Sequence, residues 1–415
     1  MTTTLQHKCP ISWYDRFMDP RSFVRKDFGE PYRDPATGWD FWAFNPAAMP
    51  RELELELETV LALSTADAAL GRLAGARRHL HDPSMFVRPY VTREALASSR
   101  IEGTQASLSE VFQADASEEE DATHDVEEVW NYRRAMDAGL RQLPDLPLVG
   151  RVVREIHAVL LQGVRGEDRM PGDFRPRPVW IGSPTDSPEN AVFVPPFERE
   201  LNDAWRDWEE FANSNPRLPT LVQCALLHYQ FETIHPFLDG NGRLGRLLIV
   251  FFLIQRRVLP APLLYISSYL EQHRREYYDR LQGVRERAEI QQWLQFFLTA
   301  VAVQAEDAVA RAERLHDLRE RYRSALAGSR SRAVEVVDRL FVNPIVTVRS
   351  VASALGITTQ GAANLVRQLQ SRGWLELAGT FGRGGRNYWI AQEVFSAISD
   401  PAPPVQMEPP QLTVS

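Results

Sequence analysis

One stretch of twelve residues, His235 to Arg246, gathers the side chains in this sequence that are best suited to chemistry at a phosphate. It reads HPFLDGNGRLGR and combines a histidine, an aspartate, three glycines, an asparagine and two arginines. A histidine can take up a proton near neutral pH. Arg243 and Arg246 lie about one helical turn apart and can fork onto phosphate oxygens. The stretch therefore predicts a phosphate-binding site with a general base beside it.

The segments on either side of this stretch indicate how it is held. Leu221 to Phe231 and Leu247 to Ile254 are apolar and read as two helices. A glycine-rich loop that opens a helix points backbone N–H groups at one spot, where the helix dipole favours negative charge. The alternative is a tight helix–helix turn whose glycines serve only the backbone. Such a turn needs neither the histidine nor both arginines, so the phosphate site is favoured.

The stretch resembles the signature of the Fic-domain family, HPFxDGNGRxxR, with every fixed position filled. The resemblance implies AMP transfer from ATP, with Mg²⁺, to a Ser, Thr or Tyr hydroxyl of a target protein, self-modification included. It implies that His235 is the general base and that Asp239 binds Mg²⁺. Mg²⁺ is a hard cation suited to carboxylate and phosphate oxygens. The positions implied to bind the nucleotide are Gly240, Asn241, Gly242, Arg243, Leu244, Gly245 and Arg246.

A second motif lies upstream, at Ser98, Glu102 and Gly103. The four-residue spacing puts Ser98 and Glu102 on one helical face, and Gly103 provides a natural helix end. Taken alone, an ordinary surface carboxylate is the simpler interpretation. Beside a Fic-like signature, the string is similar to the family's inhibitory pattern: Ser or Thr, three residues, Glu, then Gly or Asn. The resemblance implies that Glu102 pairs with Arg246 and denies that guanidinium to the γ-phosphate of ATP.

The composition of residues 171–196 differs from that of the helical segments around them, because it is rich in Pro, Gly, Asn and β-branched residues. This composition predicts a β-hairpin. One interpretation is a structural hairpin that packs on the helices. The resemblance implies instead the Fic flap, which holds the target segment in extended form through backbone pairing. Ile181 and Gly182 would then border the nucleotide.

Tyr277 and Tyr278 are adjacent on a predicted helix. Aromatic pairs on helices more often pack in the core than contact a ligand. The resemblance implies a YYxxL element whose aromatic rings line the adenosine pocket. Arg285 stands near the place where relatives often carry an asparagine. How the adenine of the nucleotide is recognised is therefore left open.

The C-terminal region resembles a winged helix-turn-helix. Residues 347–357 read as a short helix with a Gly turn, and 358–369 as a capped second helix. Two β-prone runs then flank the turn-rich residues 379–385. Residues 331–395 hold seven arginines and four acidic residues, whereas the whole chain carries −8. A local basic face favours DNA contact, and docking of a protein is the alternative.

Composition places the chain among ordinary soluble proteins. At 415 residues, with 44% hydrophobic and 25% charged residues, it has room for two or three domains. The net charge of −8 argues against a surface coated in basic patches. Cys9 and Cys224 offer no disulfide framework and suit a reducing compartment. No run approaches the ~18 apolar residues of a membrane span, and the N-terminus lacks a secretory signal. The expectation is a cytoplasmic protein without membrane contact.

The predicted fold class is mainly α: a Fic-type helical core with a β-hairpin flap, followed by a small winged helix-turn-helix domain. The expected units are 1–128 (an N-terminal arm and helices with the inhibitory motif), 129–328 (the catalytic core), 329–395 (the winged helix) and 396–415 (a Pro-rich disordered tail). The oligomeric state is not determined by the sequence, and a homodimer is compatible with it.

Two other functions are compatible with these residues. One is a Fic relative with another reaction, such as phosphate transfer or removal of AMP by water assisted by Glu102. Relatives that transfer phosphate carry Lys where this chain has Gly242, which argues against that variant. The other is a DNA-binding regulator whose Fic-like core only senses nucleotide. The intact His235 weighs against it.

Overall fold

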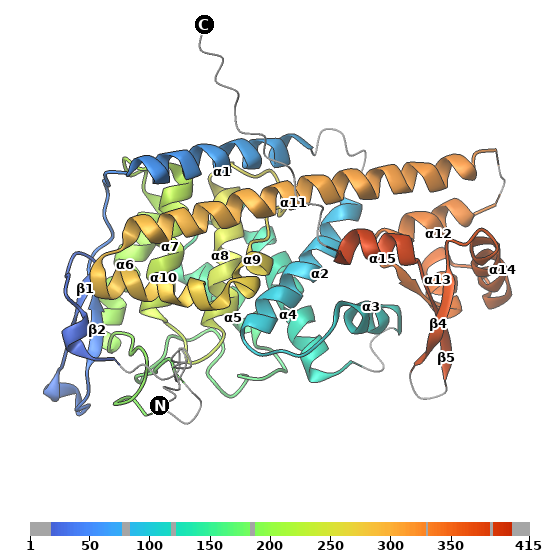
Figure 1. The fold of residues 1–415 in the computed structure, drawn as a ribbon. Coiled ribbons are helices and arrows are strands. Elements are labelled where there is room, and N and C mark those ends of the chain that lie inside the picture. Colours follow the sequence, from blue (N-terminus) through green and yellow to red (C-terminus); the bar gives the residue numbers. More distant parts are fainter. Residues whose placement is uncertain are drawn as a thin grey trace, which may run out of the picture.

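The computed structural model describes residues 18–76, 84–117, 122–182, 187–328, 331–381 and 385–400. Most of them are helical, so the mainly α fold class is confirmed (Figure 1). The helices up to the signature loop are α1 (Leu57–Ala76), α2 (Ser84–Ile101), α3 (Leu108–Ser117), α4 (His124–Gln142), α5 (Gly150–Leu160), α6 (Glu198–Asn213) and α7 (Thr220–Ile234). Those that follow it are α8 (Asn241–Gln255), α9 (Ser267–Gln272), α10 (Arg274–Arg287), α11 (Ile290–Ala325), α12 (Ala333–Leu340), α13 (Val348–Leu355), α14 (Thr359–Gln370) and α15 (Gln392–Ser399).

Two small sheets complete the described part of the chain. Near the N-terminus, β1 (Gly29–Tyr32) pairs antiparallel with β2 (Ala43–Pro46), and the short 3₁₀ turns η2 (Pro20–Ser22) and η3 (Pro35–Thr37) flank the first strand. The C-terminal sheet has the order β3-β5-β4, with both pairs antiparallel. Its strands are β3 (Ile345–Val346), β4 (Glu376–Phe381) and β5 (Arg386–Ile390).

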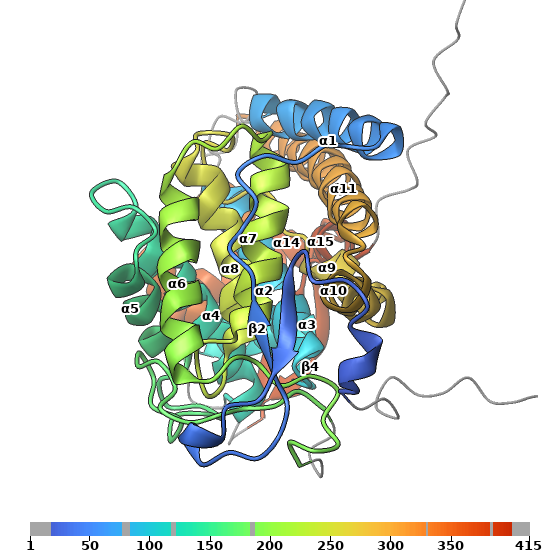
Figure 2. The same ribbon diagram turned by 90° about the vertical axis from the view of Figure 1, so that its left-hand side faces the viewer.

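The core is built around α7 and α8, the two helices joined by the signature loop. Every residue of α7 from Leu221 to Ile234 is buried. A helix that is apolar on nearly all sides must lie inside a protein. α6, α4 and α5 surround this pair, while α1 and α11 lie side by side along one edge (Figures 1 and 2). The signature loop is thus fixed between two fully packed helices.

The long helix α11 joins the core to the C-terminal unit (Figure 1). Its 36 residues span about 54 Å at 1.5 Å per residue. Its N-terminal part packs in the main core through Trp293 and Leu298, and its C-terminal part packs in the second core through Leu315 and Tyr322. The two parts of the molecule therefore share one continuous helix.

The C-terminal unit has the helix-turn-helix that the sequence predicts. Thr347 caps α13 through a reciprocal bond with Ser350, and Thr358 caps α14. Gly356 adopts a left-handed conformation (φ 61°) and ends α13. β4 and β5 form the wing, and residues 382–384 between them lie outside the described residues.

Among the described residues of 171–196, the predicted hairpin pairs through one antiparallel bridge, between Ile181 and Phe193. Residues 183–186, between them, lie outside the described part. The N-terminal segment packs on this region: the Phe44 amide donates to the carbonyl of Val194 (2.9 Å) and that of Met18 to Ala191 (2.7 Å). The first described residues of the predicted N-terminal arm thus pack on the 171–196 region.

Two predicted boundaries fall inside helices. Residue 128 lies within α4, and α15 continues past residue 395 to Ser399, with Ala397 and Ile398 buried. Residues 401–415 and Cys9 lie outside the described residues, whereas Cys224 is a free, buried thiol. Among the described residues, no helix is long and apolar enough to cross a membrane.

Candidate active site

The signature loop makes a sharp turn between α7 and α8. His235 ends α7 in the left-handed conformation (φ 49°), which is uncommon for a residue other than glycine. Gly240 takes the same region (φ 75°) at the start of α8. The Asn241 side chain closes the turn, because its Oδ1 accepts from the Phe237 amide and its Nδ2 donates to the Phe237 carbonyl, both at 2.9 Å. The amides of the first turn of a helix have no partner within that helix, so the first turn of α8 presents donors at this site.

His235 is held in place through its backbone. Its amide donates to the carbonyl of Phe231 (2.9 Å), and its carbonyl accepts from Nε of the buried Arg175 (2.8 Å). Burial, reinforced by the charges of Arg175 and Arg285, lowers the pKa of His235 to about 3. The ring is therefore neutral at physiological pH and able to accept a proton.

Arg243 is a buried cation whose hydrogen-bonding capacity is not filled. It is 1% exposed, and its Nε and Nη1 atoms have no hydrogen-bond partner among the described residues. Carboxylate oxygens of Glu128 and Asp239 lie 3.6 and 3.8 Å from its terminal nitrogens. Because buried donors are normally satisfied, this side chain is suited to receive an anion such as a phosphate.

Asp239 is the carboxylate nearest to this cation on the loop. Its Oδ1 accepts from the Gly240 amide (2.6 Å), and its side chain is 38% exposed. No group of three or more His, Cys, Asp or Glu side chains suited to a metal is found among the described residues. A single carboxylate fits Mg²⁺, which typically takes one or two carboxylates and completes its shell with substrate phosphates and water.

The structure joins the two motifs that lie 144 residues apart. Arg246 Nη2 donates to Oε1 of Glu102 (2.8 Å) and to the carbonyl of Ser98 (2.8 Å), and its Nε donates to Ser98 Oγ (2.8 Å). Burial opposes ionisation of Glu102, yet the charge of Arg246 holds its pKa below the usual value. Both groups are thus charged, in an ion pair between the buried Arg246 of α8 and the partly exposed Glu102 at the end of α2.

The carboxylate of Glu102 lies on the first turn of α8. A Cβ added to Gly242 would be 2.1 Å from Glu102 Oε1 and 3.0 Å from Nη1 of Arg246. With Glu102 in this position, no side chain fits at residue 242. The place where an anion would approach the first-turn amides is therefore occupied by a carboxylate of the chain itself. Gly103, with φ +101°, lets the chain turn away directly after it.

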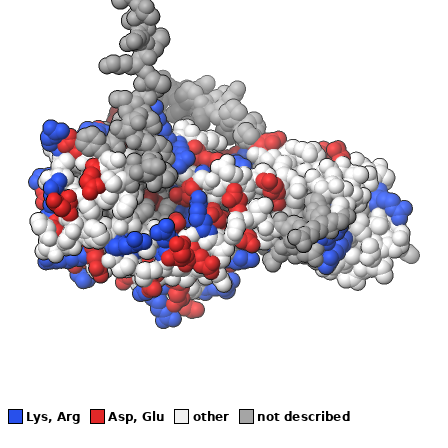
Figure 3. Space-filling model, turned by 90° about the horizontal axis from the view of Figure 1, so that it is seen from below, with Lys and Arg blue, Asp and Glu red and all other residues white. Residues whose placement is uncertain are grey.

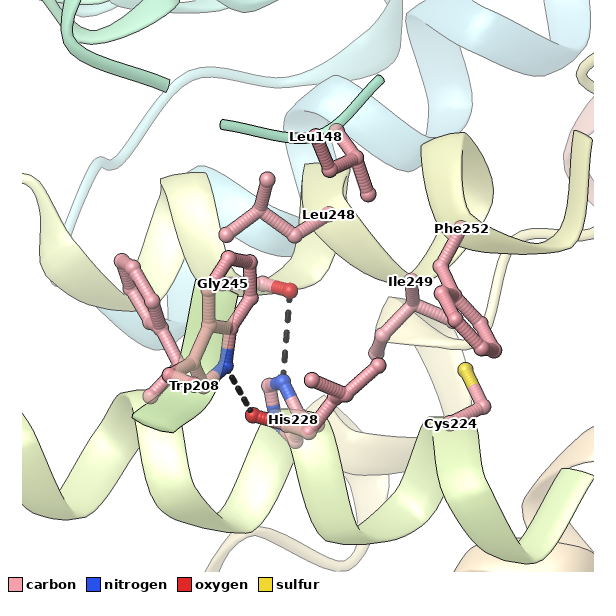
Figure 4. A pocket seen from close by; sticks show the side chains of 10 residues that line it. Leu148, Trp208, Cys224, His228, Gly245, Leu248, Ile249 and Phe252 are labelled. Carbon is pink, nitrogen blue, oxygen red and sulfur yellow. Dashed lines mark hydrogen bonds between the residues drawn. The ribbon is translucent and has the colours of Figure 1, made fainter. Parts of the chain in front are cut away.

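Two buried histidines that the sequence analysis did not single out position the loop from behind. His157 Nδ1 accepts from the Gly172 amide (2.9 Å), so its Nε2 carries the proton and donates to the Asp239 carbonyl (2.9 Å). His228 Nδ1 donates to the carbonyl of Gly245 in the same manner (3.2 Å; Figure 4). Burial lowers the pKa of His157 to about 4 and that of His228 to about 3. Both rings are neutral supports of the site.

Several positions predicted to contact nucleotide also make contacts within the protein. Tyr277 is 1% exposed and its hydroxyl donates to His228 Nε2 (2.8 Å). Tyr278 packs against Tyr277, with ring centroids 5.1 Å apart. Leu244 is fully buried, and a Cβ on Gly245 would meet Oε1 of Glu232 at 2.6 Å. These residues shape the site from beneath.

Two arginines attach the 171–196 segment to the site. Arg175 donates to the carbonyls of His235 and Pro196 at 2.8 and 2.5 Å. Arg285 lies over the ring of Phe193, 3.8 Å from its centroid, and donates to Thr233 Oγ1 (3.1 Å). Arg285 thus fixes the end of α7 to the segment that carries the Ile181–Phe193 bridge, and Gly182 continues from that bridge. Arg175 lies within the predicted hairpin region, and its role depends on tertiary contacts.

The neutral state of His157 gives a pH prediction. Its folded pKa, about 4, lies below the ordinary value of 6.5. The contribution of the neutral His157 to the free energy of unfolding is complete above pH 6.5. It is lost as the pH falls towards 4, because the unfolded chain binds the proton more tightly. His157→Gln, which keeps a donor and an acceptor, is expected to be less stable than wild type at pH 8. The difference in the free energy of unfolding should shrink by about 3 kcal/mol by pH 4, as measured by urea unfolding at both pH values. A difference that is independent of pH would show that folding does not lower the pKa of His157.

Comparison with known families finds three matches along the chain. Residues 60–141 match the Fic/DOC family N-terminal region, residues 147–253 the Fic/DOC family, and residues 334–384 an HTH DNA binding domain. The signature loop, with His235, lies inside the second match, and Ser98 and Glu102 lie inside the first. The third begins in α12 and extends through α13 and α14 to β4.

Curated proteins and solved structures give more distant likenesses. The chain is 32% identical over 117 residues to "Protein adenylyltransferase Fic" of Aedes aegypti, which is 28% of this chain and 20% of that protein. It is 38% identical over 80 residues to the protein of the same name from Drosophila erecta, 19% of this chain and 14% of that one. A Fic family protein from Desulfovibrio desulfuricans G20 has a similar fold, with a TM-score of 0.53 and 21% identity, over 82% of this chain and 97% of that structure.

Proposed function

We propose that this protein, which carries a Fic/DOC family domain behind a Fic/DOC family N-terminal region, is a protein adenylyltransferase. It transfers AMP from Mg·ATP to a Ser, Thr or Tyr hydroxyl of a target protein, and pyrophosphate leaves. The observation that carries this proposal is the neutral His235, which lies beside a helix start that presents amides and the unfilled guanidinium of Arg243.

The chain's own residues support one sequence of events. The target hydroxyl attacks the α-phosphorus of ATP, and His235 takes its proton. The bond from the α-phosphorus to the bridging oxygen breaks as the new P–O bond forms. The first-turn amides of α8 and Arg243 stabilise the charge on the phosphates. Asp239 would hold Mg²⁺, which would further neutralise the phosphate charge.

Glu102 acts as a brake in this proposal. Its ion pair with Arg246 and its position on the first turn of α8 support competition with the phosphates of ATP. Displacing the carboxylate frees both the guanidinium and the space above Gly242. Activation then requires that the Glu102 carboxylate leaves Arg246 and the first turn of α8.

The proposal is tested with ATP labelled at the α-phosphate. The full-length protein is incubated with this nucleotide and Mg²⁺, with and without a cell lysate, and label on protein is measured. Label on this chain or on a lysate protein supports AMP transfer. Label from γ-phosphate-labelled ATP, with none from the α-phosphate, would show phosphate transfer instead. No transfer from either nucleotide, together with ATP binding, would favour a nucleotide-sensing regulator.

The outer face of α14 supports a second activity, binding of duplex DNA. Gln360, Asn364 and Arg367 are exposed at intervals of four and three residues, so they share one face. They are linked through Asn364 Oδ1, which accepts from Gln360 (3.2 Å) and from Arg367 (2.5 Å). Amide and guanidinium side chains are the groups that read adenine and guanine edges in the major groove. In Figure 3 the visible face of the C-terminal unit is mostly uncharged, with a few Lys or Arg side chains, whereas charges of both signs are mixed over the core.

We expect the full-length protein to bind duplex DNA with an affinity that falls steeply as salt rises. Arg367→Ala should weaken binding by about 1–3 kcal/mol, measured by fluorescence anisotropy at constant salt. Arg332→Ala is the matched control, because Arg332 is exposed in the same unit and is already paired with Glu335 (2.6 Å). Equal affinities for both variants and wild type would remove Arg367 from the interface. Absence of DNA binding by wild type at low salt would favour protein docking.

A further inference from the structure

Helix α3 has two buried faces, and they belong to different parts of the molecule. Val111 and Ala114, three residues apart, pack in the main core. Phe112 and Ala116, four residues apart, pack in the core of the C-terminal unit. Residues three and four apart share a helical face, so α3 is held between the core and the C-terminal unit (Figure 1).

The C-terminal unit contacts both the side chains and the backbone of α3. The Phe112 ring is 1% exposed and meets the ring of Phe395 edge-on, with centroids 6.4 Å apart. Asn343 Nδ2 donates to the carbonyl of Phe112 (2.9 Å), while its Oδ1 accepts from the amide of Ile345 (2.8 Å). The Gln113 side chain donates to the hydroxyl of Tyr388, on the wing strand β5 (3.3 Å). The contact therefore involves the segment before β3, the wing and α15.

The chain between α3 and Glu102 is short and hydrogen-bonded along its length. Thr104 Oγ1 donates to Glu128 Oε2 (2.5 Å), and the Gln105 amide donates to Asp125 (2.8 Å). Arg100 donates from two nitrogens to the carbonyl of Ala106 (2.9 and 3.2 Å). Ser107 and Glu110 exchange bonds at the start of α3 (2.7 and 3.1 Å). A displacement of α3 is thus passed on to Glu102 rather than absorbed by a loose loop.

We propose that the C-terminal unit is a part of the brake: by docking on α3 it holds the end of α2 in the position where Glu102 meets Arg246. This proposal rests on the function proposed above for Glu102. The docking surface lies on β3, β5 and α15, whereas Gln360, Asn364 and Arg367 of α14 stay exposed. A partner bound to α14 and the brake contact therefore use different surfaces of one unit.

The first test measures how firmly the Glu102 segment is held, and it needs no enzymatic turnover. The amides of Glu102, Gly103 and Thr104 donate to carbonyls of Ser99 and Arg100 at 3.0–3.2 Å, so their hydrogen exchange reports how firmly this segment is held. Phe112→Ala removes the apolar contact. Asn343→Asp keeps the oxygen that accepts from Ile345 and removes the donor to Phe112. Both variants should exchange these amides about five-fold faster or more. Asn364→Asp, the same change on the exposed face of α14, should leave them unchanged.

The second test uses self-labelling by ATP labelled at the α-phosphate. Phe112→Ala and Asn343→Asp should each raise it about five-fold or more. Neither should raise it further in a Glu102→Gly background, because the brake is then already absent. A variant that only damages the fold would lower labelling in both backgrounds.

Two results would overturn the inference. One is unchanged amide exchange in both Phe112→Ala and Asn343→Asp. The other is equal stimulation by these variants with and without Glu102, which would show an effect on the core that bypasses the brake. If no variant labels at all, the proposed transferase activity fails, and the amide exchange still decides whether the C-terminal unit holds the Glu102 segment.

Discussion

His235→Ala is expected to lower AMP transfer by about 10²–10⁴-fold, the contribution typical of a positioned general base. The His235 ring is neutral in the fold because burial lowers its pKa to about 3, so wild type loses no activity to protonation of this residue at pH 7. ATP binding should change little, since the amides of α8 and Arg243 are untouched. The measurement is the rate of label transfer from α-phosphate-labelled ATP, with nucleotide affinity determined in parallel.

The matched control is His124→Ala, an exposed histidine at the start of α4 that should leave the rate unchanged. Asp239→Ala is a companion change that should abolish the response to Mg²⁺, because the loop then offers no carboxylate. Transfer at the wild-type rate by His235→Ala would remove this residue from the mechanism. Loss of ATP binding in that variant would mean that the ring shapes the nucleotide site instead.

The local architecture of the site could be predicted because the signals lie within one short stretch. Two apolar helices, a glycine-rich turn and a histidine at its entry are all readable between Leu221 and Ile254. The pairing of Glu102 with Arg246 could be predicted only from the family resemblance. Spacing alone places Ser98 and Glu102 on one face and does not say what that face meets. The structure supplies the contact and its distance, 2.8 Å.

The supporting residues could not be predicted, because their roles depend on contacts between distant segments. His157 meets the Asp239 carbonyl across 82 positions of the chain, and Arg175 meets His235 across 60. Tyr277 turns its hydroxyl to His228 for the same reason: a buried phenol needs a partner, and α7 provides one. The 171–196 region has the composition of a hairpin, yet its described residues pair at one bridge and are held otherwise by Arg175 and Arg285. In this region, the side chains of Arg175 and Arg285 hold the segment in place where a regular hairpin would use backbone hydrogen bonds between its strands.

Glu102→Gly is expected to raise self-labelling by about 10²-fold or more. In the fold, Oε1 of Glu102 binds Arg246 and lies on the first turn of α8, so phosphates that enter are denied the guanidinium and displaced from the helix start. A misplacement of ~1 Å at the reacting atoms can cost on the order of 10²-fold in rate. The gain should appear in the rate of transfer at saturating ATP, with a much smaller change in ATP affinity.

Two further variants separate the brake from the chemistry. Ser98→Ala should give a smaller rise than Glu102→Gly, because it removes the bond from Ser98 Oγ to Arg246 Nε (2.8 Å) but keeps the carboxylate. Arg246→Ala should be inactive and should not be rescued by Glu102→Gly, since the freed guanidinium is needed on the phosphate. Full activity in the double variant would show that Arg246 serves only to hold Glu102.

The same series distinguishes AMP transfer from AMP removal. If Glu102 were instead to position a water molecule that hydrolyses AMP from a modified protein, Glu102→Gly would lose the removal of AMP from a pre-labelled substrate. Measuring both reactions on the same preparations separates the two roles. Equal self-labelling by wild type and Glu102→Gly would show that the ion pair does not restrain the enzyme under those conditions. If Glu102→Gly raises labelling and wild type removes no AMP, Glu102 only inhibits. Its carboxylate then acts by occupying the position of the phosphates and has no part in catalysis.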